Sequence, residues 1–317
     1  MDYSTFLGKT LEQLGLNCDI EHNGYYLTQN QIHGWDLRLP DLKPNRYLLI
    51  HLQDYANIFH GKSPELERIT HHYGAEANRI IVTYWNHGLN RVYSGPLNLV
   101  EFSSHNCDTA MKLLDVWAGW KDIVDNPRPI NWQCLNGRKC YHRRRAVDIL
   151  KTWDNGILSY HDIIPLPGHE YSNYRYSNHE NFIELKFAYG QAAVNIVTET
   201  MYEHSPGIVT EKTQLAIAAQ QIPVVIGHQG IVQDCRDMGF DMFDDLVDTS
   251  YDYLDNNIRV EQAILRNQDL IQGRINLEPY RARLIRNREY LLHEFPEVIR
   301  QRVTRDLTAV AQQLSLI

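Results

Sequence analysis

Two charged residues stand side by side where a helix is expected to begin. Glu211 and Lys212 follow Thr210, a residue type that commonly caps a helix N-terminus with its side-chain oxygen. Glutamate in a first turn complements the helix dipole, whereas lysine opposes it unless an anion lies nearby. Backbone N–H groups at a helix N-terminus also attract anions. The pair therefore indicates a site for a phosphate-bearing ligand; the alternative is a solvated first turn.

The elements that would position this pair lie between residues 194 and 227. The order of residue types predicts a buried strand at 194–197, a turn at 204–207 (HSPG), a helix from Glu211 and a second strand at 222–226. A unit of this size implies parallel strands with a right-handed crossover. Its loop then lies at the carboxyl end of a strand, where open α/β sheets bind ligands.

A run of three arginines provides a second source of positive charge. Arg143, Arg144 and Arg145 precede a helix that the apolar spacing predicts up to Leu150. Three consecutive residues cannot share one helix face, so at least one is expected to point into a cleft. The guanidinium group offers two parallel N–H bonds that suit phosphate. A solvated helix face or a contact with DNA would explain the same run.

These motifs carry a resemblance to a known family. A strand ending in Glu199, a polar loop, Thr-Glu-Lys on a helix and then Ile-Pro-Val-Val-Ile-Gly resemble the donor-binding core of the α1,3-fucosyltransferases. Related phage and bacterial glycosyltransferase-like proteins share that core. The resemblance covers residues 131–250. Thr200 stands where the family usually has Asn, and the loop before Glu211 is longer than the family's.

The resemblance implies roles for individual residues. Lys212 would face the phosphates of a nucleotide-diphosphate sugar, and Glu211 would bind the ribose. An arginine before the preceding helix would contact the diphosphate, with Arg143 as the nearer match and Arg144 as its rival. The other expected donor-binding residues lie on the loop or at its ends: Glu199, Thr200, Ser205 and Thr210.

The alternation of strands and helices predicts an α/β protein. Apolar runs predict strands at 47–52, 80–84 and 97–102, with helices at 65–73 and 110–117 between or after them. This order predicts Rossmann-like domains, and together with the resemblance it implies two of them in a GT-B-type arrangement, followed by a C-terminal helical extension. The expected limits are 1–128 for an acceptor domain, 129–256 for the donor domain and 257–317 for the helices. The last helix is expected to pack back on the first domain.

An inverting sugar transfer would need a general base from the first domain. The candidates for this carboxylate are Asp54 after the strand at 47–52, Glu65 at the start of the helix at 65–73, and Glu101 near the end of the strand at 97–102. Asp54, which directly follows YLLIHLQ, is the preferred one. The alternative for each is a turn or cap carboxylate. A retaining transfer would need no base at this position.

Composition limits the other classes of function and location that the chain could have. A net charge of −8 disfavours a general nucleic-acid coat, although a local basic channel remains compatible with it. The start of the chain resembles no secretory signal and no run is apolar enough to span a membrane, so a cytoplasmic location is expected. Five scattered cysteines without a CxxC motif indicate free thiols, and no histidine or aspartate spacing predicts a metal site.

The sequence therefore predicts a glycosyltransferase that needs no metal or cofactor besides its nucleotide-diphosphate sugar donor. The acceptor would be a hydroxyl group, with a modified DNA base or a glycan as candidates. The alternatives are a non-catalytic binder of nucleotides or sugar nucleotides, such as a defence nucleotide, and a hydrolase of nucleotide-linked compounds.

Overall fold

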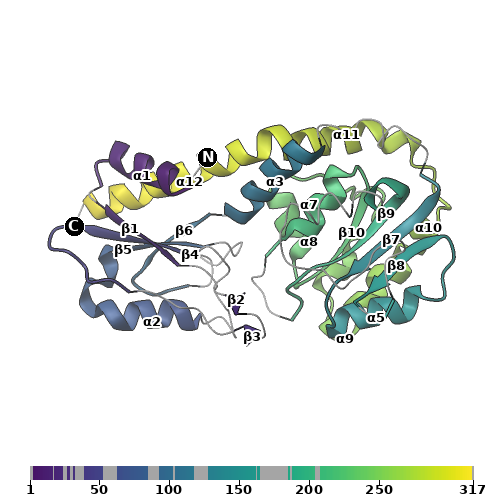
Figure 1. Cartoon of the computed structure of the whole chain (residues 1–317), viewed down its shortest axis with the longest axis horizontal. Coiled ribbons are helices and arrows are strands. Elements are labelled where there is room, and N and C mark those ends of the chain that lie inside the picture. Colours follow the sequence, from purple (N-terminus) through teal and green to yellow (C-terminus); the bar gives the residue numbers. More distant parts are fainter. Residues whose placement is uncertain are drawn as a thin grey trace. The chain divides into compact units, whose positions relative to one another are not determined.

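The computed structural model describes residues 3–16, 18–23, 27–28, 31–32, 39–52, 63–84, 93–102, 104–117, 128–161, 163–164, 185, 188–203 and 208–315. The chain divides into two compact units. Unit 1 is Met1–Cys107 with Glu297–Ile317, and unit 2 is Asp108–Pro296. Each unit contains a four-stranded parallel sheet with helices, so the expected α/β class is confirmed (Figure 1). The expected domain limits stay a prediction.

The sheet of unit 1 has the order β1 (Cys18–Asn23), β4 (Tyr47–Leu52), β5 (Ile80–Tyr84) and β6 (Asn98–Glu101), all parallel. The predicted strands at 47–52 and 80–84 are confirmed with the same limits, and β6 lies within the third prediction. The sequence analysis missed β1, because the segment CDIEHN has no apolar run. A short antiparallel pair, β2 (Leu27–Thr28) and β3 (Gln31–Ile32), follows β1 in the chain.

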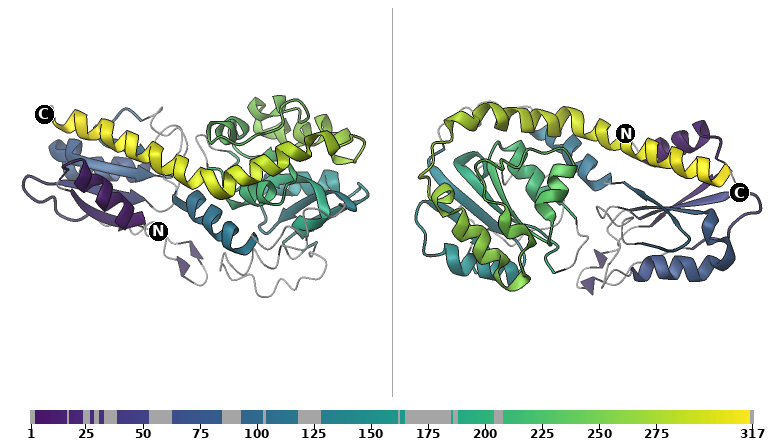
Figure 2. Two further views of the ribbon diagram at one scale, coloured as in Figure 1. Left: turned by 90° about the horizontal axis from the view of Figure 1, so that it is seen from above. Right: turned by 180° about the vertical axis from the view of Figure 1, so that it is seen from behind.

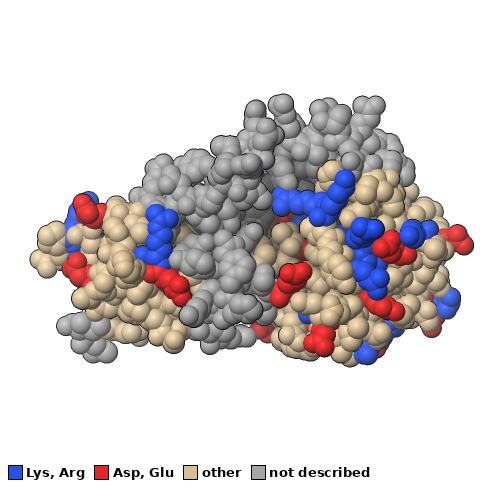
Figure 3. Space-filling model, turned by 90° about the horizontal axis from the view of Figure 1, so that it is seen from below, with Lys and Arg blue, Asp and Glu red and all other residues tan. Residues whose placement is uncertain are grey.

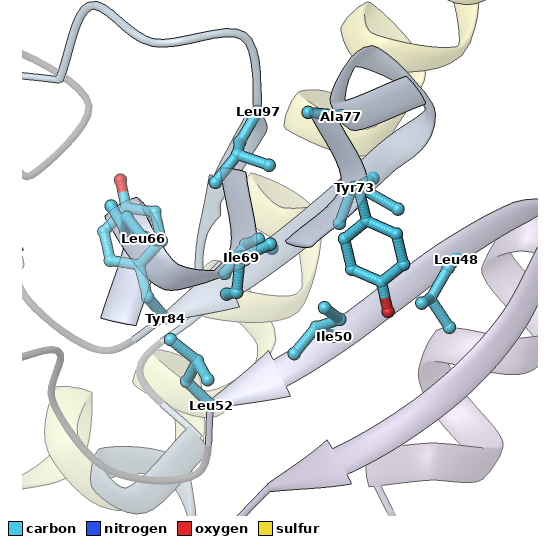
Figure 4. Close-up of a cluster of buried hydrophobic side chains, with 11 residues drawn as sticks. Leu48, Ile50, Leu52, Leu66, Ile69, Tyr73, Ala77, Tyr84 and Leu97 are labelled. Carbon is cyan, nitrogen blue, oxygen red and sulfur yellow. The ribbon is translucent and has the colours of Figure 1, made fainter. Parts of the chain in front are cut away.

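Helices cover both faces of this sheet. On one face packs α2 (Pro64–Tyr73), whose N-terminus is capped by Ser63 through a bond from the N–H of Leu66 at 3.4 Å. The side chains of this layer form one buried cluster (Figure 4): Leu48, Ile50, Leu52, Leu66, Ile69, Tyr73, Ala77, Ile80, Val82, Tyr84 and Leu97. The alternate strand residues Leu49 and Ile81 face the other side. There α1 (Tyr3–Gln13) and α12 (Phe295–Ser315) lie (Figures 1 and 2).

Unit 2 is built on the order β10 (Ile222–Ile226), β9 (Ala192–Thr198), β7 (Ile130–Asn136) and β8 (Gly156–Tyr160), again all parallel. The chain starts at β7, adds β8 on one side and then returns to add β9 and β10 on the other. The strand order therefore reverses between β7 and β9. In doubly wound sheets this reversal is where ligands bind, at the carboxyl ends of the strands.

The helices of unit 2 lie on both sides of its sheet. On one face are α5 (Tyr141–Leu150) and α9 (Asn256–Arg266); on the other are α7 (Glu211–Ala218) and α11 (Arg281–Glu289) (Figures 1 and 2). The described residues of unit 2 also contain α8 (Ile231–Asp237), α10 (Gln268–Ile271), the 3₁₀ turns Ser250–Tyr253 and Glu278–Tyr280, and a π-helical turn at Tyr290–Glu294. A further 3₁₀ turn, Gly74–Arg79, belongs to unit 1, and α3 (Ser104–Trp117) spans the division between the units.

Two features of unit 2 were not predicted. No strand was expected at β7 or β8, because β7 (INWQCLN) has the polar residues Asn131 and Gln133 between its apolar residues and β8 lies in a stretch rich in turn residues. Gln133 is buried, and its amide NH₂ group donates to Gln221 Oε1 at 3.0 Å, whereas its Oε1 has no hydrogen-bond partner within the described part of the chain. No helix within the described residues is long and apolar enough to cross a membrane.

The glycine at the start of β8 makes a close contact that gives a stability prediction. Gly156 pairs with Trp132 of β7, and a Cβ atom there would lie 2.0 Å from the indole ring. We expect Gly156→Ala to destabilise the protein by about 1–3 kcal/mol, because the buried indole must move. Gly8→Ala in α1, where the nearest described atom is 3.7 Å away, should stabilise it by about 0.5–1 kcal/mol. Urea unfolding measures both; equal stability of Gly156→Ala and the parent would contradict this packing.

Candidate functional site

The candidate site lies where the strand order of unit 2 reverses. Asn136 ends β7 and Glu199 follows β9, and the two strand ends are joined by a hydrogen bond from Thr198 Oγ1 to Asn136 Oδ1 at 2.6 Å. Each strand leads into a helix, β7 into α5 and β9 into α7. Two helix N-termini therefore follow neighbouring strands at the same edge of the sheet, which is a favourable arrangement for binding an anion.

Glu199 is a fully buried carboxylate that joins β9 to α7. Its oxygens accept bonds from the backbone N–H of Thr210 at 3.1 Å, the hydroxyl of Thr213 at 2.6 Å and the N–H of Thr200 at 3.2 Å. The hydroxyl of Thr210 donates to it as well. With its carboxylate turned inward, Glu199 positions the loop and the helix start. A direct contact between this carboxylate and a ligand, as the resemblance implies, stays a prediction.

Thr210 is the N-cap of α7, as the sequence predicted. Its backbone is extended, and its side-chain oxygen accepts from the N–H of Lys212 at 3.5 Å. The same oxygen accepts from the Lys212 ammonium group at 3.1 Å. That ammonium also donates to Thr200 Oγ1 at 3.2 Å and to Glu211 Oε1 at 2.8 Å. Lys212 thus lies at the N-terminus of α7, with three acceptors around it and a side chain that is 25% exposed.

The two rival arginines of α5 have different surroundings. Arg143 is 3% exposed, and its Nη2 donates to the carbonyl oxygens of Thr198 at 3.3 Å and Glu199 at 3.4 Å. Its Nε has no hydrogen-bond partner within the described part of the chain. Arg144 points to the surface, with a side chain 74% exposed and 3.9 Å from Asp148. The structure therefore brings Arg143, and not Arg144, to the loop that precedes α7.

Two buried basic residues near this loop, His142 and Arg259, were not predicted from the sequence. His142 donates from Nε2 to the carbonyl of Glu199 at 2.9 Å and stacks on Tyr202 with ring centroids 4.6 Å apart. Arg259 donates to the carbonyl oxygens of Gly227 at 2.6 Å and Tyr202 at 3.4 Å. Both hold the loop through backbone oxygens that lie more than thirty residues away in the chain, so no local sequence pattern could have identified them.

Of the carboxylates Asp54 and Glu101, expected as candidates for a general base, the structure describes Glu101. Glu101 lies at the carboxyl end of β6 in unit 1 and is 9% exposed. Asp54 lies outside the described residues, as does Ser205 of the expected donor-binding set. The catalytic assignments of Asp54 and Glu101 stay predictions.

Six of the eight expected donor-binding residues come together around the start of α7: Arg143, Glu199, Thr200, Thr210, Glu211 and Lys212. Among the residues with described side chains, no group of three or more His, Cys, Asp or Glu is arranged to hold a metal ion. Compared with protein-family models, with curated proteins and with solved structures, the chain matches none. The site is therefore defined by its own geometry, as a helix N-terminus with an adjacent lysine in an α/β sheet.

The buried carboxylate of Glu199 gives the second prediction. In Glu199→Gln, an amide NH₂ would replace one acceptor oxygen and face hydrogen-bond donors. We expect a loss of about 2–4 kcal/mol in the free energy of unfolding, since bonds to a buried charged group are strong and their donors would be left unpaired. Glu203→Gln, an exposed residue of the same loop, is the control and should change stability by less than about 0.5 kcal/mol. Equal effects of the two substitutions would contradict the role assigned to Glu199.

Two buried titratable groups should make stability depend on pH in opposite directions. Burial, with repulsion from Arg143, lowers the pKa of His142 from 6.5 to about 4, so the unfolded chain binds the proton more readily and stability rises between pH 4 and 6.5. Burial raises the pKa of Asp252 from 3.8 to about 6, so the folded chain binds the proton more readily and stability falls between pH 3.8 and 6. Each effect amounts to about 3 kcal/mol.

Single substitutions separate these two opposing effects. The stability difference between the parent and His142→Gln should grow in favour of the parent as pH rises from 4 to 6.5. The corresponding difference for Asp252→Asn should shift in favour of the variant as pH rises from 3.8 to 6. Urea unfolding at several pH values measures both differences. If the two stability differences changed with pH in the same direction, one of these groups would not be buried as described.

Proposed function

We propose that this chain is a GT-B-type glycosyltransferase that takes a sugar from a nucleotide-diphosphate donor to a hydroxyl acceptor. The observation that carries the proposal is the position of the Lys212 ammonium group. It lies at the N-terminus of α7, bonded to the N-cap oxygen, at the edge where parallel α/β sheets bind ligands. Helix N–H groups and one lysine are together suited to a diphosphate.

Ligand binding at this site would be an exchange of partners. Of the three acceptors of Lys212, Thr200 and Thr210 are neutral hydroxyls and Glu211 is the charged one, with a side chain 31% exposed. A donor phosphate would replace Glu211, whose carboxylate would then accept bonds from the ribose hydroxyls. Negative charge grows on the leaving nucleotide in the transition state, and Lys212 with the α7 dipole would stabilise it.

The acceptor site and the general base would belong to the first domain, where Glu101 at the end of β6 is the candidate base within the described residues. A modified DNA base or a glycan is the proposed acceptor, and the proposed reaction uses no metal.

Non-catalytic binding of a nucleotide or sugar nucleotide is the second candidate function, and one observation favours it. The guanidinium group of Arg143 is buried against backbone carbonyl oxygens. Lys212 would therefore supply the positive charge that binds a diphosphate. Binding needs only this charge, whereas rapid departure of a nucleotide benefits from further cations.

Nucleotide binding is the prediction that tests both candidates. In a thermal-unfolding panel of nucleoside diphosphates and their sugars, one nucleotide class at a hundred times its dissociation constant should stabilise the protein by about 2.7 kcal/mol. Lys212→Ala should remove this shift. Lys43→Ala, which removes another ion-paired lysine, in unit 1, should keep it. An unchanged melting temperature with every nucleotide would exclude both candidate functions.

The same nucleotide sugars distinguish sugar transfer from binding without a reaction. A transferase should convert the stabilising nucleotide sugar to nucleoside diphosphate and a glycosylated acceptor. A hydrolase would release free sugar instead, and a binding protein would leave the ligand intact.

A further inference from the structure

A second basic feature of unit 2 lies on the other side of α5 from the Lys212 site. A groove of about 600 Å³ runs beside this helix, within the size range of ligand pockets. Its lining residues come from the start and outer face of α5 and from β8 and the turn after it: Lys139, Cys140, Tyr141, Arg144, Val147, Asp148, Lys151, Tyr160, Ile163 and Ile164.

The groove is positively charged in a protein that is acidic as a whole. Its lining contains three basic residues, Lys139, Arg144 and Lys151, and one acidic residue, Asp148, whereas the whole chain carries −8. Asp148 lies 3.0 Å from Lys151 and 3.9 Å from Arg144, so one carboxylate serves two exposed cations. The first turn of α5 contains no acidic residue, and its N-cap, Cys140, makes no side-chain capping bond. The helix dipole therefore adds to the positive potential.

Two of these cations, Arg144 on α5 and Lys151 at its C-cap, lie on one side of the helix. Arg144, Val147, Asp148 and Lys151 recur at intervals of three and four residues, so they form one stripe along α5. A ten-residue helix is about 15 Å long, which corresponds to roughly four stacked nucleotides of a single strand. Figure 3, seen from below, shows Lys and Arg side chains in blue, with Asp and Glu side chains in red among them, on the side of unit 2 on which Figure 1 labels α5.

Exposed apolar side chains stand next to these charges. Tyr141 is 53% exposed and Ile163 is 60% exposed, and both line the groove. Single-stranded nucleic acids are bound by this combination, because cations follow the phosphates while aromatic rings stack with the bases. An acidic peptide would use the cations but would need no exposed ring. A mononucleotide would leave part of the stripe without a phosphate.

We propose that the groove beside α5 binds a short single-stranded segment of nucleic acid, with Lys139, Arg144 and Lys151 at the phosphates and Tyr141 stacked on a base. The Lys212 site and this groove use different side chains, so the proposal does not depend on the nucleotide-sugar hypothesis.

Fluorescence anisotropy with a labelled single strand of roughly eight nucleotides tests the proposal. The double variant Arg144→Gln/Lys151→Gln should bind about tenfold more weakly. Its plot of log affinity against log salt should be less steep by about 1.4, because two phosphate contacts are lost. The matched control is Arg274→Gln/Arg305→Gln, in which each arginine also pairs with a nearby aspartate at the surface. This control should bind like the parent.

Stacking is tested at Tyr141. Tyr141→Ala should weaken binding by about fivefold or more, whereas Tyr141→Phe should retain it because the ring is kept. Heparin that binds as tightly as the oligonucleotide, together with no effect of Tyr141→Ala, would identify a general polyanion surface and overturn the proposal. Equal losses in the groove variant and the charge-matched control would overturn it as well, as would the absence of oligonucleotide binding.

The position of the bound oligonucleotide can be determined from the alkylation rate of a native thiol. Cys140 lines the groove and is half-buried, whereas Cys107, Cys134 and Cys235 are buried and burial raises the pKa of Cys18 to about 12. The oligonucleotide should therefore slow alkylation of Cys140, as peptide mass spectrometry would show. No protection at saturating oligonucleotide would place the strand elsewhere. Lys212→Ala should bind the oligonucleotide like the parent; loss of this binding would place the strand at the nucleotide site and overturn the separate groove.

Discussion

The arrangement at the carboxyl edge of unit 2 depends on the buried carboxylate of Glu199. A charge without exposure to water is costly, and here its cost is offset by donors from three threonines, Thr200, Thr210 and Thr213. Two of these belong to the start of α7, whose dipole also favours a negative charge. Glu199 therefore fixes the N-cap, and the N-cap oxygen in turn accepts from Lys212. The position of the lysine follows from a residue that is itself inaccessible.

The sequence predicted those elements whose signals are local. Strands such as 80–84 and 222–226 are continuous apolar runs, and Thr210 before Glu-Lys is a local cap signal, so their limits matched the structure. The strand β7 could not be recognised in this way, since it contains Gln133. The NH₂ group of this amide donates to Gln221, which lies 88 residues further along the chain. Polar residues inside a buried strand become understandable once such a distant partner is known.

The candidate site, like the fold, was predicted from the sequence only where its signals are local. The residue types and order around α7 predicted that Glu199, Thr210 and Lys212 would lie at one helix N-terminus, but not which arginine of α5 would turn toward them. Three consecutive arginines cannot share a helix face, and α5 indeed separates them: Arg143 turns to the end of β9, Arg144 to the surface and Arg145 toward Glu261 of α9. Spacing along a helix gives this separation without indicating which face is buried. That depends on the carbonyl oxygens of Thr198 and Glu199, which are more than fifty residues away.

The surroundings of Lys212 explain how a satisfied cation can still bind a ligand. Its contacts with Thr200 and Thr210 hold the amine at the end of α7 without neutralising it, because hydroxyls carry no charge. Its contact with Glu211 is a partly exposed ion pair, and such pairs contribute about 1 kcal/mol or less. Replacing that carboxylate by a phosphate would therefore cost little, while the two hydroxyls keep the ammonium group in position. A lysine held in this way loses less conformational entropy on binding than a mobile one, which favours affinity.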